Sequence, residues 1–306
     1  MGWTCASDCD HLCTRAVERS RLAAGGCPVQ YHGKWDFVRL WGAQEPASVA
    51  LSLANLGAHA WGFSRVRRAE SAAATPRGRV RAPSWIVLLF FLTSILAWAC
   101  SAAFHARDLP ATERADYLCA GASVGAGALL AAQRALRATS PRSVGALAST
   151  LLVPLLVKGH SMVSRRFDYG GWMGLCGALL AVQVAGWTAV LVRGWRESGG
   201  DAAGDTRPRA REQDAGPAKA GGAARRPLVR AWPAASPLRP PPAVAPLAAA
   251  LSLLLPATLL EVFDFPPIGS VLDAHAAWHA ATVPVTVLLY RFLAVDASRA
   301  GKAERD

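Results

Sequence analysis

Seven long apolar segments constrain the fold of this 306-residue chain more than any other feature of its sequence. Each is about 16–22 residues long, which is enough for a helix to cross roughly 30 Å of hydrocarbon. The chain is therefore predicted to be an all-α, polytopic membrane protein with seven transmembrane helices. The segments lie at residues 46–63, 84–105, 116–133, 143–158, 171–193, 243–262 and 275–294.

The loops between these segments alternate in charge, and this alternation predicts the orientation of the chain. The first, third and fifth loops are basic, the second and sixth are net acidic, and the fourth is mixed. Because Lys and Arg accumulate on the cytosolic side of membrane proteins, we place the three basic loops and the C-terminus in the cytosol. The N-terminus and the other loops are then luminal or extracellular. Seven spans with a cytosolic C-terminus also require a luminal N-terminus.

The polar and apolar stretches divide the chain into five regions. Residues 1–45 form a luminal segment that contains cysteines, residues 46–194 hold the first five transmembrane helices, and residues 243–294 hold the last two. The connection at 195–242 is basic, rich in Pro, Gly and Ala, and without an apolar period, so it is predicted to be a disordered cytosolic linker. Residues 295–306 form a cytosolic tail.

The cysteines fall into two groups. Four lie in the N-terminal segment, where they fit either a disulfide framework in an oxidising lumen or a zinc cluster. The others lie inside apolar segments, where packing is the expected role of a thiol. The first group is Cys5, Cys9, Cys13 and Cys27, and the second is Cys100, Cys119 and Cys176.

The formal net charge of +12 does not indicate a nucleic-acid-binding protein. The excess of Arg lies in the loops predicted to be cytosolic. A nucleic-acid-binding surface would need Lys and Arg interleaved with aromatic residues on one folded face, and the sequence contains no such stretch. We therefore expect no nucleic acid among the partners of this chain.

Five polar residues at the ends of apolar segments are candidates for a functional site, because such groups are costly at membrane depth. Ser101 and His105 are four residues apart at the end of the second segment, so they share a helix face. Asp116 begins the third segment, and His275 and His279, again four apart, begin the seventh. The orientation derived from the loops places His105, Asp116, His275 and His279 at the luminal side of the membrane, and Ser101 lies one turn from His105.

These residue types fit a catalytic zinc site. Three neutral imidazoles can bind Zn²⁺ and leave a fourth position open for water, whose pKa the metal lowers to about 7. Asp116 could accept the proton of this water and pass it to the leaving oxygen, and Ser101 could donate to the developing oxyanion. Asp273 could orient an imidazole or simply face the lumen.

Other interpretations of the same residues compete with the metal site. A hydrogen-bond network among these side chains could hold three helices together without any metal. The remaining histidines have no such neighbours and are interpreted as background residues. They are His11, His32, His59 and His160.

Several motifs resemble those of a known family. The stretch "HGKWDFVRLWGAQEPASVALSLAN" at residues 32–55 is similar to its HGKWPF and QEPAS signatures. The stretches "FHARDLPATERADY", "RRFDYG" and "DFPPIGSVLDAHAAWH" are similar to three further motifs, and the matches follow in order from Gly2 to about Leu293. On these residues the chain is identified as a member of the post-GPI attachment to proteins factor 3 family, whose members remodel the lipid of GPI anchors.

The resemblance implies a fold, an activity and a site. It implies membership of a superfamily of seven-span membrane hydrolases that includes alkaline ceramidases and the adiponectin and progestin receptors. The implied activity is of the phospholipase A2 type and removes the sn-2 acyl chain from the phosphatidylinositol of GPI anchors, with GPI-anchored proteins and membrane lipid as substrates. The implied location is the Golgi or the endoplasmic reticulum. The superfamily pattern matches Ser101, His105, Asp116, His275 and His279, with Zn²⁺ as the cofactor.

The chain also departs from the family pattern. Asp36 stands where the family has proline, and "GWM" follows Gly170 in place of a tyrosine and an asparagine. Family members begin with a signal peptide and a further Cys-containing segment, so the resemblance implies that this sequence lacks a segment preceding Met1. These departures concern loops and the N-terminus and leave the proposed site residues in place.

Two other functions remain alternatives to the hydrolase. One is a non-catalytic seven-span receptor or GPI-protein-handling factor, in which a structural zinc would take Asp116 as its fourth ligand. The other is a ceramidase-like amidase, which the same five residues could serve. A transporter is disfavoured because the sequence has no internal repeat and no pair of Gly/Pro-interrupted spans at matching positions.

Overall fold

The computed structural model describes residues 2–73, 84–164, 168–204 and 241–302, and the statements below concern these residues. They form eight helices and only isolated β-bridges. The helices are α1 Cys5–Ala23, α2 Pro46–Ala73, α3 Ser84–Ala106, α4 Pro110–Leu136, α5 Pro141–Ser164, α6 Tyr169–Gly204, α7 Ala245–Val262 and α8 Ala274–Lys302.

Each of the seven apolar segments forms a helix, as predicted, and most of these helices extend beyond the apolar core. Helix α6 continues to Gly204, so the beginning of the predicted linker at 195–242 is helical. Residues 205–240 of that linker lie outside the described residues. Helix α1 was not predicted from the sequence; Thr4 caps it, because its hydroxyl accepts a hydrogen bond from the Ser7 backbone N–H at 3.2 Å.

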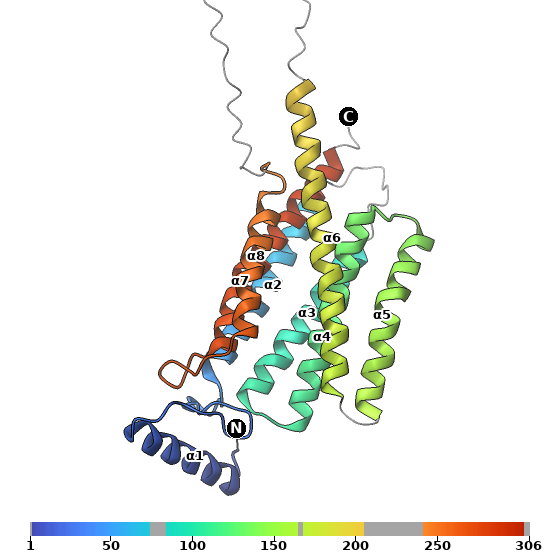
Figure 1. Cartoon of the computed structure of the whole chain (residues 1–306). Coiled ribbons are helices and arrows are strands. Elements are labelled where there is room, and N and C mark those ends of the chain that lie inside the picture. Colours follow the sequence, from blue (N-terminus) through green and yellow to red (C-terminus); the bar gives the residue numbers. More distant parts are fainter. Residues whose placement is uncertain (1, 74–83, 165–167, 205–240, 303–306) are drawn as a thin grey trace, which may run out of the picture.

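Helices α2 to α8 form one bundle, and α1 lies across the end of the bundle that is opposite the C-terminus (Figure 1). Within the bundle α2 packs against α8 and α3, while α4 packs between α3 and α6. Helix α5 contacts mainly α4 and stands at the edge of the bundle. The chain passes through the bundle once with each helix, so loops from distant parts of the sequence meet at each end.

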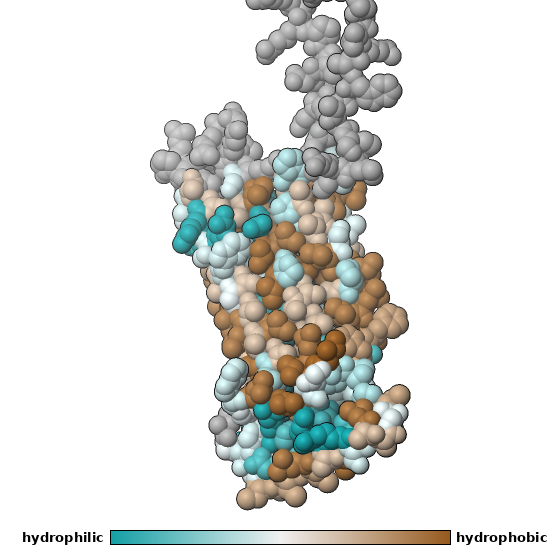
Figure 2. Space-filling view, turned by 90° about the vertical axis from the view of Figure 1, so that its left-hand side faces the viewer, coloured by the Kyte–Doolittle hydropathy of each residue, from teal (hydrophilic) through white to brown (hydrophobic). Residues whose placement is uncertain are grey.

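The surface of the bundle carries a broad hydrophobic zone, with hydrophilic groups gathered towards both ends of the view (Figure 2). By length and composition, six of the described helices are apolar enough to cross a membrane, namely α3 to α8. These findings agree with a polytopic membrane protein. Helix α2 is not among the six, although it occupies a central place in the bundle.

The low hydropathy of α2 comes from polar residues that face the interior of the bundle. Ser48, Ser52, Asn55 and His59 follow one another at spacings of three and four, so they lie on one helix face. All four are buried. The outward-facing side of this part of α2 is therefore more apolar than its average composition indicates.

The N-terminal segment, residues 2–45, folds as a cap over one end of the bundle. Arg15 of α1 forms an ion pair with the buried Asp36 at 3.1 Å. Trp35 Nε1 donates to Asp264 in the loop between α7 and α8, and the Val38 N–H donates to the Ser270 carbonyl oxygen of the same loop. The cap thus joins two parts of the chain that are more than two hundred residues apart.

The two departures from the family motifs have clear structural roles. Asp36 is the partner of Arg15, and burial raises the pKa of its carboxyl. Trp172, in the "GWM" stretch, is buried and donates from Nε1 to the Tyr117 carbonyl oxygen at 3.1 Å. It fills the space beside Gly121, where a Cβ would stand 2.2 Å from its ring. Both substitutions therefore connect neighbouring elements.

All seven cysteines carry free thiols in the structure. The four in the cap are exposed, and neither a disulfide nor a cysteine metal site forms among the described residues. Cys100 of α3 and Cys119 of α4 are in contact, with their sulfurs 3.6 Å apart. These two thiols take part in the packing of α3 against α4, as expected for cysteines inside apolar segments.

Candidate metal centre

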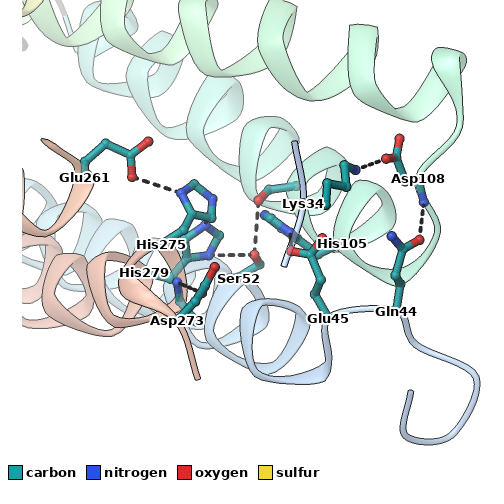
Figure 3. A network of polar contacts seen from close by, with 12 residues as sticks. Lys34, Gln44, Glu45, Ser52, His105, Asp108, Glu261, Asp273, His275 and His279 are labelled. Atoms are coloured by element: carbon teal, nitrogen blue, oxygen red, sulfur yellow. Dashed lines mark hydrogen bonds and ion pairs between the residues drawn. The ribbon is translucent and has the colours of Figure 1, made fainter. Parts of the chain in front are cut away.

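The structure brings together His105 at the end of α3 and His275 and His279 at the start of α8. One nitrogen of each imidazole lies within 4.8 Å of the corresponding nitrogens of the other two. His105 and His279 are buried, with 3% and 1% of their surface exposed, and His275 is partly exposed. In Figure 3 the three rings gather at one place, with Glu261 and Glu45 on opposite sides of them. Among the described residues no other group of His, Cys, Asp or Glu has this arrangement.

Asp273 positions the two histidines of α8 by starting that helix. Its Oδ1 accepts a hydrogen bond from the Ala276 backbone N–H at 2.8 Å, which is the contact of an N-cap residue. Burial raises the pKa of its carboxyl. With the helix begun at Ala274, His275 and His279 stand one turn apart on the same face. The sequence left open whether Asp273 orients an imidazole or faces the lumen, and its side-chain contact in the structure is this hydrogen bond that caps the helix.

Each of the three imidazoles has a partner at its Nδ1 atom. His105 Nδ1 lies 2.6 Å from Glu45 Oε2, and His275 Nδ1 lies 2.9 Å from Glu261 Oε2. An ionised carboxylate only accepts hydrogen bonds, so both imidazoles carry their proton on Nδ1. Burial acts to raise the pKa of Glu45, but the hydrogen bond and charge of His105 lower it overall. The third imidazole, His279, has its Nδ1 atom 3.0 Å from the Ser52 hydroxyl.

The three Nε2 atoms are thereby left for a common ligand. His105 Nε2 is buried and has no hydrogen-bond partner among the described residues, which is costly unless something else binds it. The Nε2 atoms of His275 and His279 are 3.0 Å apart. Two nitrogens bound to one tetrahedral zinc ion stand roughly 3.3 Å apart, given Zn–N distances of about 2.0–2.1 Å. The residues therefore fit a metal bound by three imidazoles.

The structure places the two predicted catalytic residues at different distances from the imidazoles. Ser101 is buried on the same face of α3 as His105, and its Oγ is 3.1 Å from Ser52 Oγ. Its connection to the histidines thus runs through Ser52. Asp116, near the start of α4, is partly exposed and interacts electrostatically with His105 and His275.

Sequence reasoning did not identify three residues that contact the imidazoles, namely Glu45, Ser52 and Glu261. A signal for the two carboxylates was present, because Glu45 directly precedes the first apolar segment and Glu261 ends the sixth. Both therefore lie at the end of the apolar segments where the histidines were selected. No comparable signal pointed to Ser52, since a serine inside an apolar segment is unremarkable without its neighbours.

The histidines interpreted as background lie outside the cluster. His59 of α2 is buried, and its Nδ1 is 3.2 Å from the hydroxyl of Tyr290 in α8. Its ring also makes edge contacts with Phe90 and Tyr290. The others are in the cap or on α5, and they are His11, His32 and His160.

Comparison with known proteins gives consistent matches over almost the whole chain. The profile of the Per1-like family matches residues 1–297. The "GPI-specific phospholipase A2-like PGAP3" of Cricetulus griseus is 32% identical over 295 residues, which cover 96% of this chain and 77% of that protein. The protein of the same name from Homo sapiens is 31% identical with the same coverage. The "Protein PER1 homolog" of Schizosaccharomyces pombe is 30% identical over 95% of this chain and 74% of that protein. No solved structure matches the chain.

Proposed function

The chain belongs to the Per1-like family, and on this basis we propose that it remodels GPI anchors as a zinc-dependent phospholipase A2-type hydrolase. Its substrate would be the phosphatidylinositol of a GPI anchor, from which it would release the sn-2 fatty acid. Relatives that are about 30% identical over most of their length bear names containing "GPI-specific phospholipase A2-like". This similarity supports the substrate class, while the arrangement of side chains supports the reaction.

The convergence of three Nε2 atoms is the observation that carries the proposal. The Nδ1 atoms of His105 and His275 point to carboxylates, which keeps their Nε2 lone pairs available. Within the part of the chain that the structure describes, the buried Nε2 of His105 has no hydrogen-bond partner. A metal ion held there supplies Lewis-acid polarisation of an ester carbonyl and of a water molecule.

The remaining residues of the site account for the proton and the developing charge. Asp116 takes the proton from the attacking water and returns it to the leaving alkoxide oxygen of the glycerol. The bond between the acyl carbon and that oxygen breaks, so the products are a free fatty acid and a lyso-lipid. The Ser101 hydroxyl donates to the oxygen of the acyl carbonyl as negative charge develops on it.

The proposed membrane arrangement includes α2 as the seventh span. Helix α2 has the length of a span, the polar residues between Ser48 and His59 are buried against neighbouring helices, and it packs between α3 and α8. We propose that the N-terminal cap and the metal centre face the lumen of the Golgi or endoplasmic reticulum and that the C-terminus is cytosolic. The alternating loop charges support this orientation.

Metal analysis combined with analysis of GPI lipids tests the proposal. His105→Ala and His279→Ala should each abolish metal binding by the purified protein and abolish sn-2 remodelling in a remodelling-deficient cell. The matched control is His59→Ala, which removes a buried histidine from the same helix bundle but not from the metal centre. Normal remodelling by the His105 or His279 variant would overturn the metal-centre assignment. Release of a fatty acid from ceramide rather than from GPI lipid would favour the amidase alternative.

A further inference from the structure

We propose that Ser52 is a positioning residue that links the position of the His279 ring proton to the Ser101 hydroxyl, so that metal binding turns this hydroxyl towards the site. The inference rests on the proposed function and deepens it. It assigns a role to a residue of α2, a helix that supplies none of the predicted ligands. The three residues form a continuous hydrogen-bonded chain from α8 through α2 to α3.

This hydrogen-bonded chain of three side chains is short and buried, and neighbouring contacts hold it in place. Ser52 is fully buried, and its Oγ lies 3.0 Å from His279 Nδ1 and 3.1 Å from Ser101 Oγ. One turn along α2, the Asn55 side chain donates to the His279 carbonyl oxygen at 2.8 Å. This second contact fixes the position of α8 relative to α2 at the histidine. Figure 3 shows Ser52 beside His279, with its hydroxyl directed to the imidazole.

With both imidazoles of α8 neutral and no metal bound, these contacts set one direction for the hydrogen bonds. His275 donates from Nδ1 to Glu261, so in its neutral form its Nε2 must accept. The nearest donor is Nε2 of His279, at 3.0 Å. A neutral His279 protonated on Nε2 has a bare Nδ1, which accepts from the Ser52 hydroxyl. The only hydroxyl hydrogen of Ser52 is then used in this bond, so Ser52 accepts a hydrogen bond from Ser101. The Ser101 hydroxyl hydrogen therefore points away from the site.

With metal, the direction reverses. Ligation uses the Nε2 lone pair of His279, so the proton of the neutral imidazole moves to Nδ1 and is donated to Ser52 Oγ. A serine hydroxyl has one hydrogen, so Ser52 now donates to Ser101 Oγ. The Ser101 hydrogen is released from this contact and can be donated to a substrate oxygen. Ser101 therefore acts as an oxyanion donor only when the metal is in place, and His279 cannot serve as a base that activates it.

The variants that test this inference interrupt the hydrogen bonds from His279 through Ser52 to Ser101, which we call the relay, without removing a metal ligand. Ser52→Ala should weaken metal affinity about 10-fold, at the low end of the effect of losing a ligand's supporting hydrogen bond. Ser101→Ala should leave metal affinity within about 3-fold of wild type, because Ser101 does not contact the imidazole. Ser52→Thr keeps the hydroxyl and should restore most of the affinity. The matched control is Ser48→Ala, one turn earlier on the same buried face of α2, where the hydroxyl has no hydrogen-bond partner among the residues that the structure describes.

Turnover of the metal-loaded protein tests the connection to Ser101. Ser101→Ala should lower kcat about 100-fold, as expected for an oxyanion-hole donor. Ser52→Ala should lower kcat less, and the double variant should be no slower than Ser101→Ala alone because Ser52 acts through Ser101. Losses that multiply in the double variant would overturn the relay, as would wild-type metal affinity in Ser52→Ala.

The direction of the hydrogen bonds from His279 through Ser52 to Ser101 can be measured without an activity assay. Nitrogen-15 NMR of labelled histidines should show the proton of His279 on Nε2 in the metal-free protein and on Nδ1 after zinc is added, with the signal assigned by its loss in His279→Ala. A proton on Nδ1 in both states would contradict the reversal. If the wild type binds zinc but hydrolyses no GPI lipid, the proposed function fails, while the NMR and affinity measurements still decide the role of Ser52.

Discussion

Glu45 contacts His105 through both its backbone and its side chain. The Glu45 N–H donates to the His105 carbonyl oxygen at 3.0 Å, and the Glu45 carboxylate accepts from His105 Nδ1 at 2.6 Å. The first contact ties the start of α2 to the end of α3, and the second orients the imidazole. One residue of the "QEPAS" stretch therefore couples the packing of two helices to the geometry of the metal centre.

Replacing Glu45 should weaken metal binding without unfolding the protein. Glu45→Gln keeps the backbone contact and a neutral acceptor for His105 Nδ1–H, but loses the charge that makes the imidazole a better ligand. We expect metal affinity to fall roughly 10–100-fold, which is the typical effect of losing a carboxylate behind a ligating histidine. Competition with a chromophoric chelator measures this affinity in detergent.

The matched control for this variant is Asp264→Asn. Asp264 is another carboxylate at the same end of the bundle, and it accepts hydrogen bonds from Gln30 and Trp35. Its replacement should leave metal affinity unchanged. Equal losses in both variants would show that the effect of Glu45 is a general effect of charge or stability and not of its contact with His105.

Asp116→Asn separates catalysis from metal binding. The carboxylate lies within electrostatic reach of His105 and His275, and the proposed function makes it the group that moves the proton. We expect full metal content and a loss of turnover of at least about 100-fold, the usual contribution of a general base. Elemental analysis and product analysis on the same preparation measure the two quantities together.

Glu113→Gln, one turn earlier on α4, is the control for Asp116 and should keep both metal and turnover. A large loss of metal from Asp116→Asn would identify Asp116 as a fourth ligand. That result would favour the closed, structural site of a non-catalytic protein over a hydrolase, because no position would be left for water.

The helices could be predicted from sequence because membrane spans are set by the length and polarity of local segments. The predicted segment 84–105 became α3 at Ser84–Ala106, and 243–262 became α7 at Ala245–Val262. Helix α1 was not predicted because it is polar, and its stability depends on contacts such as the Arg15–Asp36 ion pair. Local composition carries no information about such partners.

The candidate site was only partly predictable from sequence, because some of its contacts depend on tertiary packing. Depth along the membrane follows from sequence, and depth alone grouped His105 with the two histidines of α8. Rotation of a helix about its axis depends on tertiary packing, so the facing of Ser52 towards His279 could not be derived. The difference between Asp273 as a helix cap and as a support for an imidazole likewise depends on side-chain direction.

Gly62 of α2 permits a close approach of α8 at Tyr290. A Cβ at this position would stand 2.3 Å from Cγ of Tyr290, so the two helices would have to separate. We expect Gly62→Ala to lower the free energy of unfolding by about 1–3 kcal/mol, as overpacking does. Thermal unfolding in detergent, followed by size-exclusion chromatography, measures the change.

Gly57 on the same helix provides the control for Gly62. It is exposed, and an added Cβ would meet nothing within 4 Å. Gly57→Ala should therefore be neutral or stabilise the protein by up to about 1 kcal/mol, the gain in helix propensity. Equal destabilisation by both alanines would argue against a close contact between α2 and α8 at Tyr290.

The ion pair between Lys34 and Asp108 should anchor the N-terminal cap to the loop between α3 and α4. Burial lowers the pKa of Lys34, and its ammonium also lies 4.9 Å from the centre of the Phe104 ring. Both side chains remain partly exposed, so we expect Lys34→Met or Asp108→Asn to cost roughly 1–2 kcal/mol, less than a fully buried pair. Each single variant leaves a charge without its partner.

The double variant tests whether the Lys34–Asp108 ion pair is the reason for the loss of stability in the single variants. Lys34→Met combined with Asp108→Asn leaves no unpaired charge, so its loss of stability should be smaller than the sum of the single losses. The protease sensitivity of residues 2–45 should rise in each single variant and return partly to the wild-type level in the double variant. The corresponding cycle at Lys158 and Asp168, a more exposed ion pair, should show little coupling. Additive losses at Lys34 and Asp108 would mean that the cap is held by its other contacts, such as those of Trp35 with Asp264.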